Sequence, residues 1–446
     1  YKMDIEEIKE LINTKQFTQL KKELKEMKSA DVSMILDELD KEQAVIVFRL
    51  LSKEKAGMAF AYMETDMREK LIKDLTDAEL KNVLDELFMD DTVDLIEEMP
   101  SNVVTRILKN VDKNDRKIIN ELLKYPDDSA GSIMTTEFID LKEDMTIEQA
   151  LDRIRQIGTD SETIYTCYVL DKDRKLQGII SIKEILLAKE ESLITDNMET
   201  NIISVNTLED KEEVAKKFDK YDFYALPVVD HENRLVGIVT IDDAINVLQD
   251  EVEEDFEKMA AMAPTEESYF GTSVFKHAKN RIVWLLVLML SSAITGTIIT
   301  NYENAFAAVP LLVAFIPMLM DTGGNCGSQS STLIIRGLAT DELEVKDVFK
   351  ILWKEVRIAI IVGATLSVIN GLRIFAQYKN LQLACTVGLS ITVTVILSKS
   401  IGCFLPLLAK KLKLDPAIMA APLITTIVDI LSVLVYFNIA TVIMGI

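Results

Sequence analysis

The chain has 446 residues, which is enough for two or three domains. It combines 49% hydrophobic residues with a formal net charge of -23, and these two properties occupy different parts of the sequence. Residues 1–275 contain 35 basic and 63 acidic residues, whereas residues 276–446 contain 14 basic and 9 acidic residues in an apolar background. The acidic part repels phosphates and attracts divalent cations, which argues against nucleic acid as a partner.

Residues 1–127 are predicted to form an all-α N-terminal domain of stacked short helices, a solenoid rather than a catalytic fold. Most of the predicted helices open near Ser, Thr or Asp, the residues that cap helix N-termini. The clearest of them are 76–87, 90–99, 101–111 and 112–123. Asp90, Asp91 and Asp94 crowd one helix start, where the helix dipole compensates only part of their charge. We expect this trio to bind a cation.

Residues 128–250 contain an internal duplication, with copies at about 128–190 and 196–250. Each copy is predicted to be a β-rich unit with two amphipathic helices and a turn between strands. The predicted elements are 147–157, 166–170 and 178–184 in the first copy, and 214–219, 225–229 and 237–243 in the second. This pattern resembles a tandem pair of cystathionine-β-synthase-type (CBS) modules, which have an α/β fold. The resemblance implies dimerisation and the binding of ATP or another adenine nucleotide between the copies.

In CBS modules, a Ser or Thr followed three residues later by Asp holds the nucleotide ribose. Thr240 and Asp243 match that pattern, whereas the first copy departs from it with Ser181 and Glu184. The alternative interpretation is that Asp243 only caps or flanks the helix that follows.

Residues 241–275 are predicted to form an acidic connecting helix that leads into the apolar part. Like charges four residues apart, such as Asp250 and Glu254, destabilise a helix. A helix of this composition is favoured when cations neutralise it, and Asp250, Glu254 and Asp255 are the candidate ligands. The alternative is a solvated acidic face.

Residues 276–446 are predicted to form a transmembrane domain of five helices, because long apolar runs recur at about the 20 residues that cross a bilayer. The predicted spans are 282–301, 306–335, 355–376, 381–409 and 417–443, and the second is expected to be long and interrupted. Basic residues gather before the first span, in the second loop and before the last span, and such loops face the cytoplasm. The N-terminus is therefore expected in the cytoplasm and the C-terminus outside the cell membrane.

Ionisable residues within a bilayer are costly and mark candidate functional sites. Asp429 lies deep in the last span, downstream of Pro422, Thr425 and Thr426. The second span carries a polar, glycine-rich run at 321–329, which indicates either backbone that lines a cavity or close helix packing. Lys399 in the fourth span is expected either to extend toward the interface or to pair with an acidic group.

The candidate ligands are hard oxygen atoms, which favour Mg²⁺ over soft metals and zinc. The chain has 2 histidines and no arrangement of His, Cys or Ser that is typical of catalysis, so an enzyme is not expected. Mn²⁺, Co²⁺ and Ca²⁺ remain compatible with the same ligands.

Two motifs make the whole chain resemble the MgtE family of magnesium channels: Gly324-Asn325-x-Gly327-x-Gln329 in the second span, and Pro422-x-x-Thr425-Thr426-x-x-Asp429 in the last. The resemblance implies a homodimer in the lipid bilayer, with a pore on its two-fold axis lined by the second and fifth spans.

The same resemblance assigns pore roles to Asp429, Asn325 and Asp415. It also implies that intracellular Mg²⁺ bridges the N-terminal domain, the CBS pair and the connecting "plug" helix to close the pore. The sensor residues implied by the family overlap the acidic clusters and include Asp90, Asp91, Asp94, Asp230, Asp243 and Asp250.

Two other function classes compete with a channel. A secondary transporter that exchanges Mg²⁺ for Na⁺ would have its site in the interrupted second span, but the five predicted spans show no inverted repeat, which disfavours this alternative. A membrane enzyme regulated by CBS modules is disfavoured by the missing catalytic residues.

Overall fold

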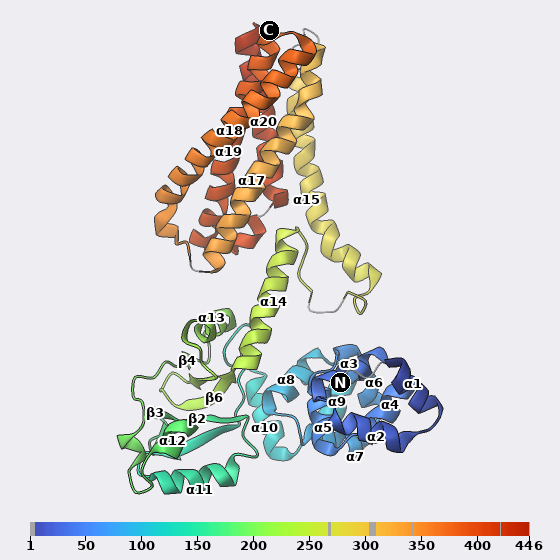
Figure 1. The fold of residues 1–446 in the computed structure, drawn as a ribbon, viewed down its shortest axis with the longest axis vertical. Helices are drawn as coiled ribbons and strands as arrows, with labels where there is room; N and C mark the ends of the chain where they lie inside the picture. The colour runs from blue at the N-terminus through green and yellow to red at the C-terminus, as the bar shows by residue number, and fades with distance from the viewer. Residues whose placement is uncertain (1–4, 266–268, 303–308, 341, 420, 446) are drawn as a thin grey trace. The chain divides into compact units, whose positions relative to one another are not determined.

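In the computed structural model, the described residues are 5–265, 269–302, 309–340, 342–419 and 421–445. The chain divides into two compact units, Tyr1–Gln249 and Asp250–Ile446 (Figure 1). Each unit has hydrophobic clusters of its own.

The N-terminal domain consists of short amphipathic helices. They are α1 Ile5–Asn13, α2 Phe17–Glu26, α3 Ser29–Glu38, α4 Lys41–Leu50, α5 Lys53–Ala61, α6 Thr65–Asp74, α7 Asp77–Leu84, α8 Met89–Glu98, α9 Ser101–Asn110 and α10 Lys113–Leu122. Thr76 caps α7 in a capping box with Glu79, because its side chain and that of Glu79 satisfy each other's backbone N–H groups. Leu36, Leu71 and Leu95 are fully buried, so the apolar faces form the core.

The CBS pair contains two sheets of the same topology. Its elements are β1 Phe138–Lys142, α11 Ile147–Ile157, β2 Thr163–Leu170, β3 Leu176–Ser181, α12 Ile182–Leu187, η1 Ile194–Asp196, β4 Val205–Asn206, α13 Lys211–Tyr221, β5 Ala225–Val229, β6 Leu235–Thr240 and α14 Ile241–Met259. In each sheet the first strand is parallel to the second, and the second is antiparallel to the third. The repeated sheet order confirms the internal duplication that the sequence indicates.

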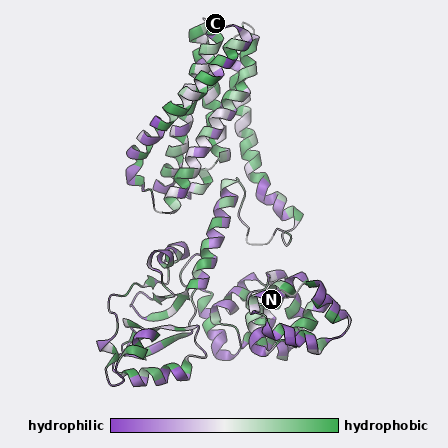
Figure 2. Cartoon of the chain, viewed as in Figure 1, coloured by the Kyte–Doolittle hydropathy of each residue, from purple (hydrophilic) through white to green (hydrophobic). Residues whose placement is uncertain are grey.

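The second unit is a bundle of long helices that are mostly hydrophobic along their length (Figure 2). They are α15 Val274–Asn301, η2 Pro310–Phe315, α17 Ile316–Ala339, η3 Val345–Asp347, α18 Val348–Tyr378, α19 Leu381–Lys411, η4 Pro416–Met419 and α20 Ala421–Met444. Within the described residues, the segments that contain α15, α18, α19 and α20 are long and apolar enough to cross a membrane.

Helix α17 does not belong to that apolar set among the described residues, because polar residues and glycine fill its centre. Its 24 residues nevertheless measure about 36 Å at 1.5 Å per residue, which exceeds the ~30 Å of a bilayer core. The five predicted spans thus correspond to five long helices, one of them polar, although residues 306–308 at the start of the second predicted span lie outside the described residues.

The glycine-rich run of α17 is continuous helix and does not interrupt the span, contrary to the expected interruption. A Cβ atom at Gly323 would lie 2.8 Å from Val428 of α20 and 2.9 Å from Thr394 of α19. A Cβ atom at Gly402 of α19 would collide with the carbonyl oxygen of Gly327. These glycines allow three helices to approach closely, which is the packing interpretation of the run.

Candidate cation pathway and acidic cluster

A polar stripe runs along one face of α17. Asp321, Asn325 and Gln329 are spaced four residues apart and are all exposed, while Gly323 and Gly327 face the other helices. Because residues at i and i+4 share a helix face, the three oxygen-bearing side chains form one row. The glycine-rich run at 321–329 contains all three residues, but only the buried glycines show which side of the helix remains uncovered.

Asp429 lies on the neighbouring helix α20, eight residues after the helix begins at Ala421, or about 12 Å along its axis. Its side chain is half-buried. Gly323 and Gly324 of α17 pack against Val428 and Thr425 of α20, so the helix segments that carry Asp321 and Asp429 lie side by side. This arrangement attracts cations.

Pro422 is the second residue of α20, so it begins that helix and does not interrupt the span around Asp429. The hydroxyls of Thr425 and Thr426 each donate to the carbonyl oxygen of Pro422 at 2.9 Å. Both hydroxyl oxygens keep lone pairs that can accept from water around an ion.

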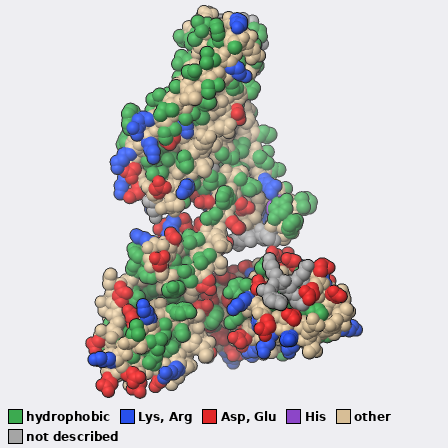
Figure 3. Space-filling view, in the orientation of Figure 1, with side chains coloured by type: hydrophobic (Ala, Val, Ile, Leu, Met, Phe, Trp, Pro, Cys, Tyr) green, Lys and Arg blue, Asp and Glu red, His purple; other side chains and the backbone are tan. Residues whose placement is uncertain are grey.

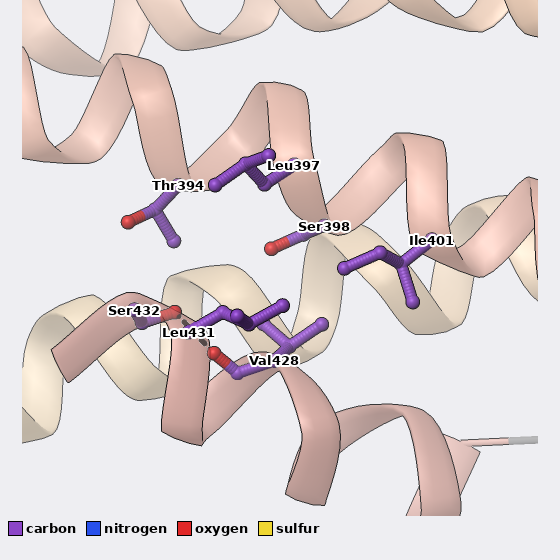
Figure 4. A pocket seen from close by; sticks show the side chains of 7 residues that line it. All are labelled: Thr394, Leu397, Ser398, Ile401, Val428, Leu431 and Ser432. Atoms are coloured by element: carbon purple, nitrogen blue, oxygen red, sulfur yellow. Dashed lines mark hydrogen bonds between the residues drawn. The ribbon is translucent and has the colours of Figure 1, made fainter. Parts of the chain in front are cut away.

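Behind this face, α19 and α20 meet along a seam that contains hydroxyl groups (Figure 4). Ser432 donates to the carbonyl oxygen of Val428 at 2.7 Å, whereas the buried hydroxyls of Thr394 and Ser398 have no partner among the described residues. The hollow between them has no room for a water-sized sphere. We therefore assign no separate site to this seam.

Asp415 lies just before η4, where its carboxylate accepts from the backbone N–H of Ala417 at 2.8 Å. Its other oxygen forms an ion pair of 2.6 Å with Lys258 of α14, and Lys258 also pairs with Glu254. Partial burial alone would lower the pKa of Lys258, but the bonds to Asp415 and Glu254 outweigh it and raise that pKa. Two of the predicted metal ligands are therefore held by an ammonium group.

A second group of carboxylates lies in the first unit, where α8 faces the CBS pair; Figure 3 shows how acidic that unit's surface is. We call this group the acidic cluster. Its members are Asp90, Asp91, Asp94, Glu137, Glu162, Asp242 and Asp243. The backbone N–H of Met89, at the start of α8, donates to Glu137 at 2.9 Å, which joins the two domains directly.

Burial and mutual repulsion raise the pKa values in the acidic cluster. Asp90 is only 9% exposed, and burial together with the charges of Asp243 and Asp91 raises its pKa well above the usual range. Burial, with neighbouring carboxylates, raises the pKa of Asp243 to about 7 and that of Glu162 to about 8.

Asp91 and Asp94 follow the same trend. Burial raises the pKa of Asp91 to about 6 although Arg68 opposes the rise. Burial and the charge of Asp243 raise the pKa of Asp94 to about 7. The Asp94 side chain is also in contact with solvent, which weakens its repulsion by the neighbouring carboxylates. Such crowding costs free energy unless protons or cations neutralise it.

The cluster joins some predicted sensor residues and not others. The predicted trio and Asp243 belong to it, while Asp230 lies in the turn between β5 and β6 and accepts from the backbone N–H groups of Glu232 and Arg234. Asp250 and Asp255 lie farther along α14, which ends at Met259 and not at residue 275 as predicted. Within the described residues, no three His, Cys, Asp or Glu side chains are close enough to hold an ion directly.

Thr240 and Asp243, the predicted ribose ligands, are hydrogen-bonded to each other. The Thr240 hydroxyl donates to Asp243 at 2.7 Å and also to Asp242. Ser181 and Glu184 form a full capping box at the corresponding place in the first CBS module. Hydrogen bonds of this kind at a helix start are those that the capping interpretation expects.

Sequence reasoning missed Glu137 and Glu162. Both lie in loops that precede strands, and no motif or spacing distinguishes them from other surface glutamates. Only the tertiary contact with α8 identifies them. Glu162 is the most unusual, because its Oε2 atom is buried without a hydrogen-bond partner among the described residues.

A bundle of membrane-crossing helices with a row of carboxylate and amide side chains, attached to a CBS pair, defines a multi-pass membrane protein of the cation-transport class. The family model described as "Divalent cation transporter" (MgtE) matches residues 316–439. The model of the MgtE intracellular N domain matches residues 27–128, and the CBS-domain model matches residues 130–191 and 192–250.

Curated relatives agree with these matches. The magnesium transporter MgtE of Bacillus subtilis is 33% identical over 430 residues, covering 94% of this chain and 95% of the relative. That of Thermus thermophilus is 33% identical over 424 residues, covering 94% of each. The chain belongs to the MgtE family, which consists of transporters and not of enzymes.

Solved structures resemble the first half of the chain. The cytosolic domain of the Mg²⁺ channel MgtE in complex with ATP has a TM-score of 0.52 at 33% identity, covering 55% of this chain and 100% of that one. The soluble part of a magnesium transporter has the same TM-score at 28% identity, covering 56% and 99%.

Proposed function

We propose that the protein is a Mg²⁺-selective channel of the cell membrane that intracellular Mg²⁺ closes. The observation that carries the conduction part is the polar face of α17 beside Asp429 of α20. Every candidate ligand there is an oxygen atom, and Asp429 and Asp321 supply the negative charge. Mg²⁺ keeps most of its water and is held by one or two carboxylates, so a hydrated ion suits this face.

The pore is proposed to form in a homodimer, with the N-terminus in the cytoplasm and the C-terminus outside. A row of Asp321, Asn325 and Gln329 is costly against lipid, because polar groups in a bilayer need polar or charged partners. A second copy that presents the same row would enclose a hydrated path and double the number of Asp429 carboxylates. Asp415 would lie at the cytoplasmic end of that path.

The acidic cluster is the proposed Mg²⁺ sensor. It joins α8 to the CBS pair with carboxylates that repel one another, and a cation that binds only the compact arrangement shifts the equilibrium toward it. Because no three of these side chains converge on one point, the ion would bind through its water shell. The acidic residues of α14, including Asp250, Glu254 and Asp255, would add further weak sites on the connecting helix.

An adenine nucleotide is proposed as a second ligand of the CBS pair, at Thr240 and Asp243. The support is the sequence pattern, together with the ATP complex of the related cytosolic domain. Binding would require Asp243 to release the Thr240 hydroxyl. The nucleotide would bring its own divalent cation, since an uncompensated phosphate would be repelled by the acidic cluster.

Mg²⁺ flux into proteoliposomes tests the conduction proposal. Asp429→Ala should abolish or sharply reduce flux, whereas Asp347→Ala, on η3 away from the polar row, should leave it unchanged. If the Asp429 variant carries Mg²⁺ at the parent rate, the pore assignment is wrong. Single-channel recording separates this proposal from exchange of Mg²⁺ for Na⁺, and the unbroken α17 already lacks the interrupted helix of that alternative.

A further inference from the structure

A buried charged network connects three helices of the membrane unit. Ser330 of α17 donates its hydroxyl to Glu355 of α18 at 2.7 Å and accepts from the ammonium of Lys399 of α19 at 3.2 Å. Lys399 and Glu355 are themselves 3.8 Å apart. Ser330 is 0% exposed, Lys399 5% and Glu355 7%, so the alternative in which Lys399 extends to the interface is excluded in favour of an ion pair.

The network lies next to a very close contact between α17 and α19. A Cβ at Gly402 would collide with the backbone of Gly327, so α17 and α19 touch at these two residues. Ser330 follows Gly327 by three residues and Lys399 precedes Gly402 by three, which places both on the contact side, one turn away.

At this contact α17 presents Gly323, Gly324 and Gly327 to α19 and α20, and such small residues allow close approach without the interlocking that larger side chains provide. Larger side chains, among them Leu319 and Ile334, pack in hydrophobic clusters on either side of it. Hydrogen bonds and ion pairs are directional, so they can restrain the axial position of α17 where these small residues do not. Besides the charged network, the Ser331 hydroxyl donates to the carbonyl oxygen of Met419 at 2.9 Å.

Stability alone does not account for a buried ion pair, because apolar side chains of similar volume are often as stabilising at such places. What an ion pair adds is a requirement for one geometry, since displacement leaves two charges buried without partners. Here that geometry includes the axial position of α17 relative to α19.

We propose that Glu355, Ser330 and Lys399 form a latch that fixes the axial position of α17, and thereby holds the polar row that includes Asn325 in its place beside α20. These three are positioning residues and do not touch the ion. Ser330 is five residues from Asn325 on the same helix. A slip of α17 by one helical turn along its axis would move Asn325 by about 5.4 Å relative to α20, because that is the pitch of an α-helix. The consequence for conduction rests on the proposed channel function, whereas the latch itself does not.

Disulfide trapping in the full chain in proteoliposomes measures the position of α17 directly. A Cβ at Gly324 would lie 3.4 Å from the Cβ of Thr425, close to the separation in disulfides, so the parent for the test carries Gly324→Cys and Thr425→Cys. The four native cysteines Cys167, Cys326, Cys385 and Cys403 are replaced by Ala in that parent. Samples are first purified as folded protein by size exclusion.

Two variants remove the latch without leaving one charge alone: Ser330→Ala, and the pair Glu355→Leu with Lys399→Met. Ser390→Ala is the matched control, because Ser390 is also 0% exposed but donates only to the carbonyl oxygen of Thr386 in its own helix. We expect the rate of disulfide formation to fall at least tenfold in both latch variants and to stay at the parent rate in the control.

The result that overturns the latch is a parent rate of disulfide formation in Ser330→Ala or in the double variant. A role in stability alone predicts that result, since the folded fraction would keep the native position of α17. If the double variant does not fold, the nearly isosteric Ser330→Ala decides the question. Mg²⁺ flux, measured in protein without the added cysteines, tests the proposed function independently of the latch. If the parent protein fails to conduct Mg²⁺, the proposed function is contradicted, but the trapping result for the latch remains valid.

Discussion

Replacing Glu162 by Gln should strengthen the contact between α8 and the CBS pair when Mg²⁺ is absent. The Oε2 atom of Glu162 is buried without a partner, and the charges of Asp242, Asp243 and Asp91 act on it. Glutamine has nearly the same shape and no charge. The substitution therefore removes one of the negative charges that repel one another and leaves the packing unchanged.

The magnitude follows from the pKa of Glu162. Burial and the neighbouring charges raise it from 4.5 to about 8, which at 1.36 kcal/mol per pKa unit is about 5 kcal/mol as an upper bound. Partial exposure and salt screening reduce this to roughly 1–3 kcal/mol. In the closed arrangement, in which α8 contacts the CBS pair, Glu162 holds its proton more tightly than in the open one. The stabilisation of the closed arrangement by this proton is therefore fully present below the usual pKa of Glu and is lost as the pH rises toward 8.

Amide hydrogen exchange of α8, Met89–Glu98, in the full-length protein measures this opening. In Mg²⁺-free buffer at pH 8, exchange corrected for the intrinsic rate should be about ten- to hundredfold slower in Glu162→Gln than in the parent. At pH 5 the difference should shrink to a few-fold at most, because Glu162 is already protonated. Millimolar Mg²⁺ should slow exchange in the parent more than in the variant.

Glu191→Gln is the matched control, because Glu191 lies exposed in the same CBS module and outside the acidic cluster. It should leave exchange of α8 unchanged at both pH values. Equal protection of α8 in the parent and in Glu162→Gln at pH 8 would refute the repulsion argument, and so would a gain of the same size at pH 5.

Three further predictions concern ions and nucleotide. Asp429→Asn should retain a folded protein yet reduce Mg²⁺ flux at least tenfold, as measured in proteoliposomes; undiminished flux in membrane-inserted variant would contradict its role. Lys258→Met should shift the Mg²⁺ concentration that half-closes the channel upward by a few-fold, because Glu254 and Asp415 lose their shared ammonium; the ion pair is partly exposed, so its contribution is about 0–1 kcal/mol. An unchanged midpoint in single-channel records would show that this ion pair has no part in closure. Asp243→Ala should eliminate the binding of MgATP seen by calorimetry, with Asp230→Ala as the control; no heat from the parent with any adenine nucleotide at millimolar concentration would favour the capping role alone.

Local sequence patterns predicted the elements of this protein well. Helix α11 spans Ile147–Ile157 and strand β5 spans Ala225–Val229, and both ranges agree with the sequence prediction. The long apolar runs likewise correspond to long helices, because length and hydropathy reflect a bilayer directly. Motif residues such as Asn325 and Asp429 were recognisable because they are polar in an apolar environment.

Contacts between distant segments were decided only by the tertiary structure. Met89 and Glu137 are joined although they are far apart in the sequence, and nothing near Glu137 indicates that contact. The same holds for the partner of Lys399, since the sequence contained several acidic candidates and only helix packing selects Glu355. The glycines of α17 could equally have lined an interrupted segment, but the helix is continuous, and a side chain at Gly402 would collide with Gly327, so the glycines serve close packing on α19. A sequence records which groups are charged or small, but repulsion, pairing and close approach depend on distances that exist only once the helices have packed.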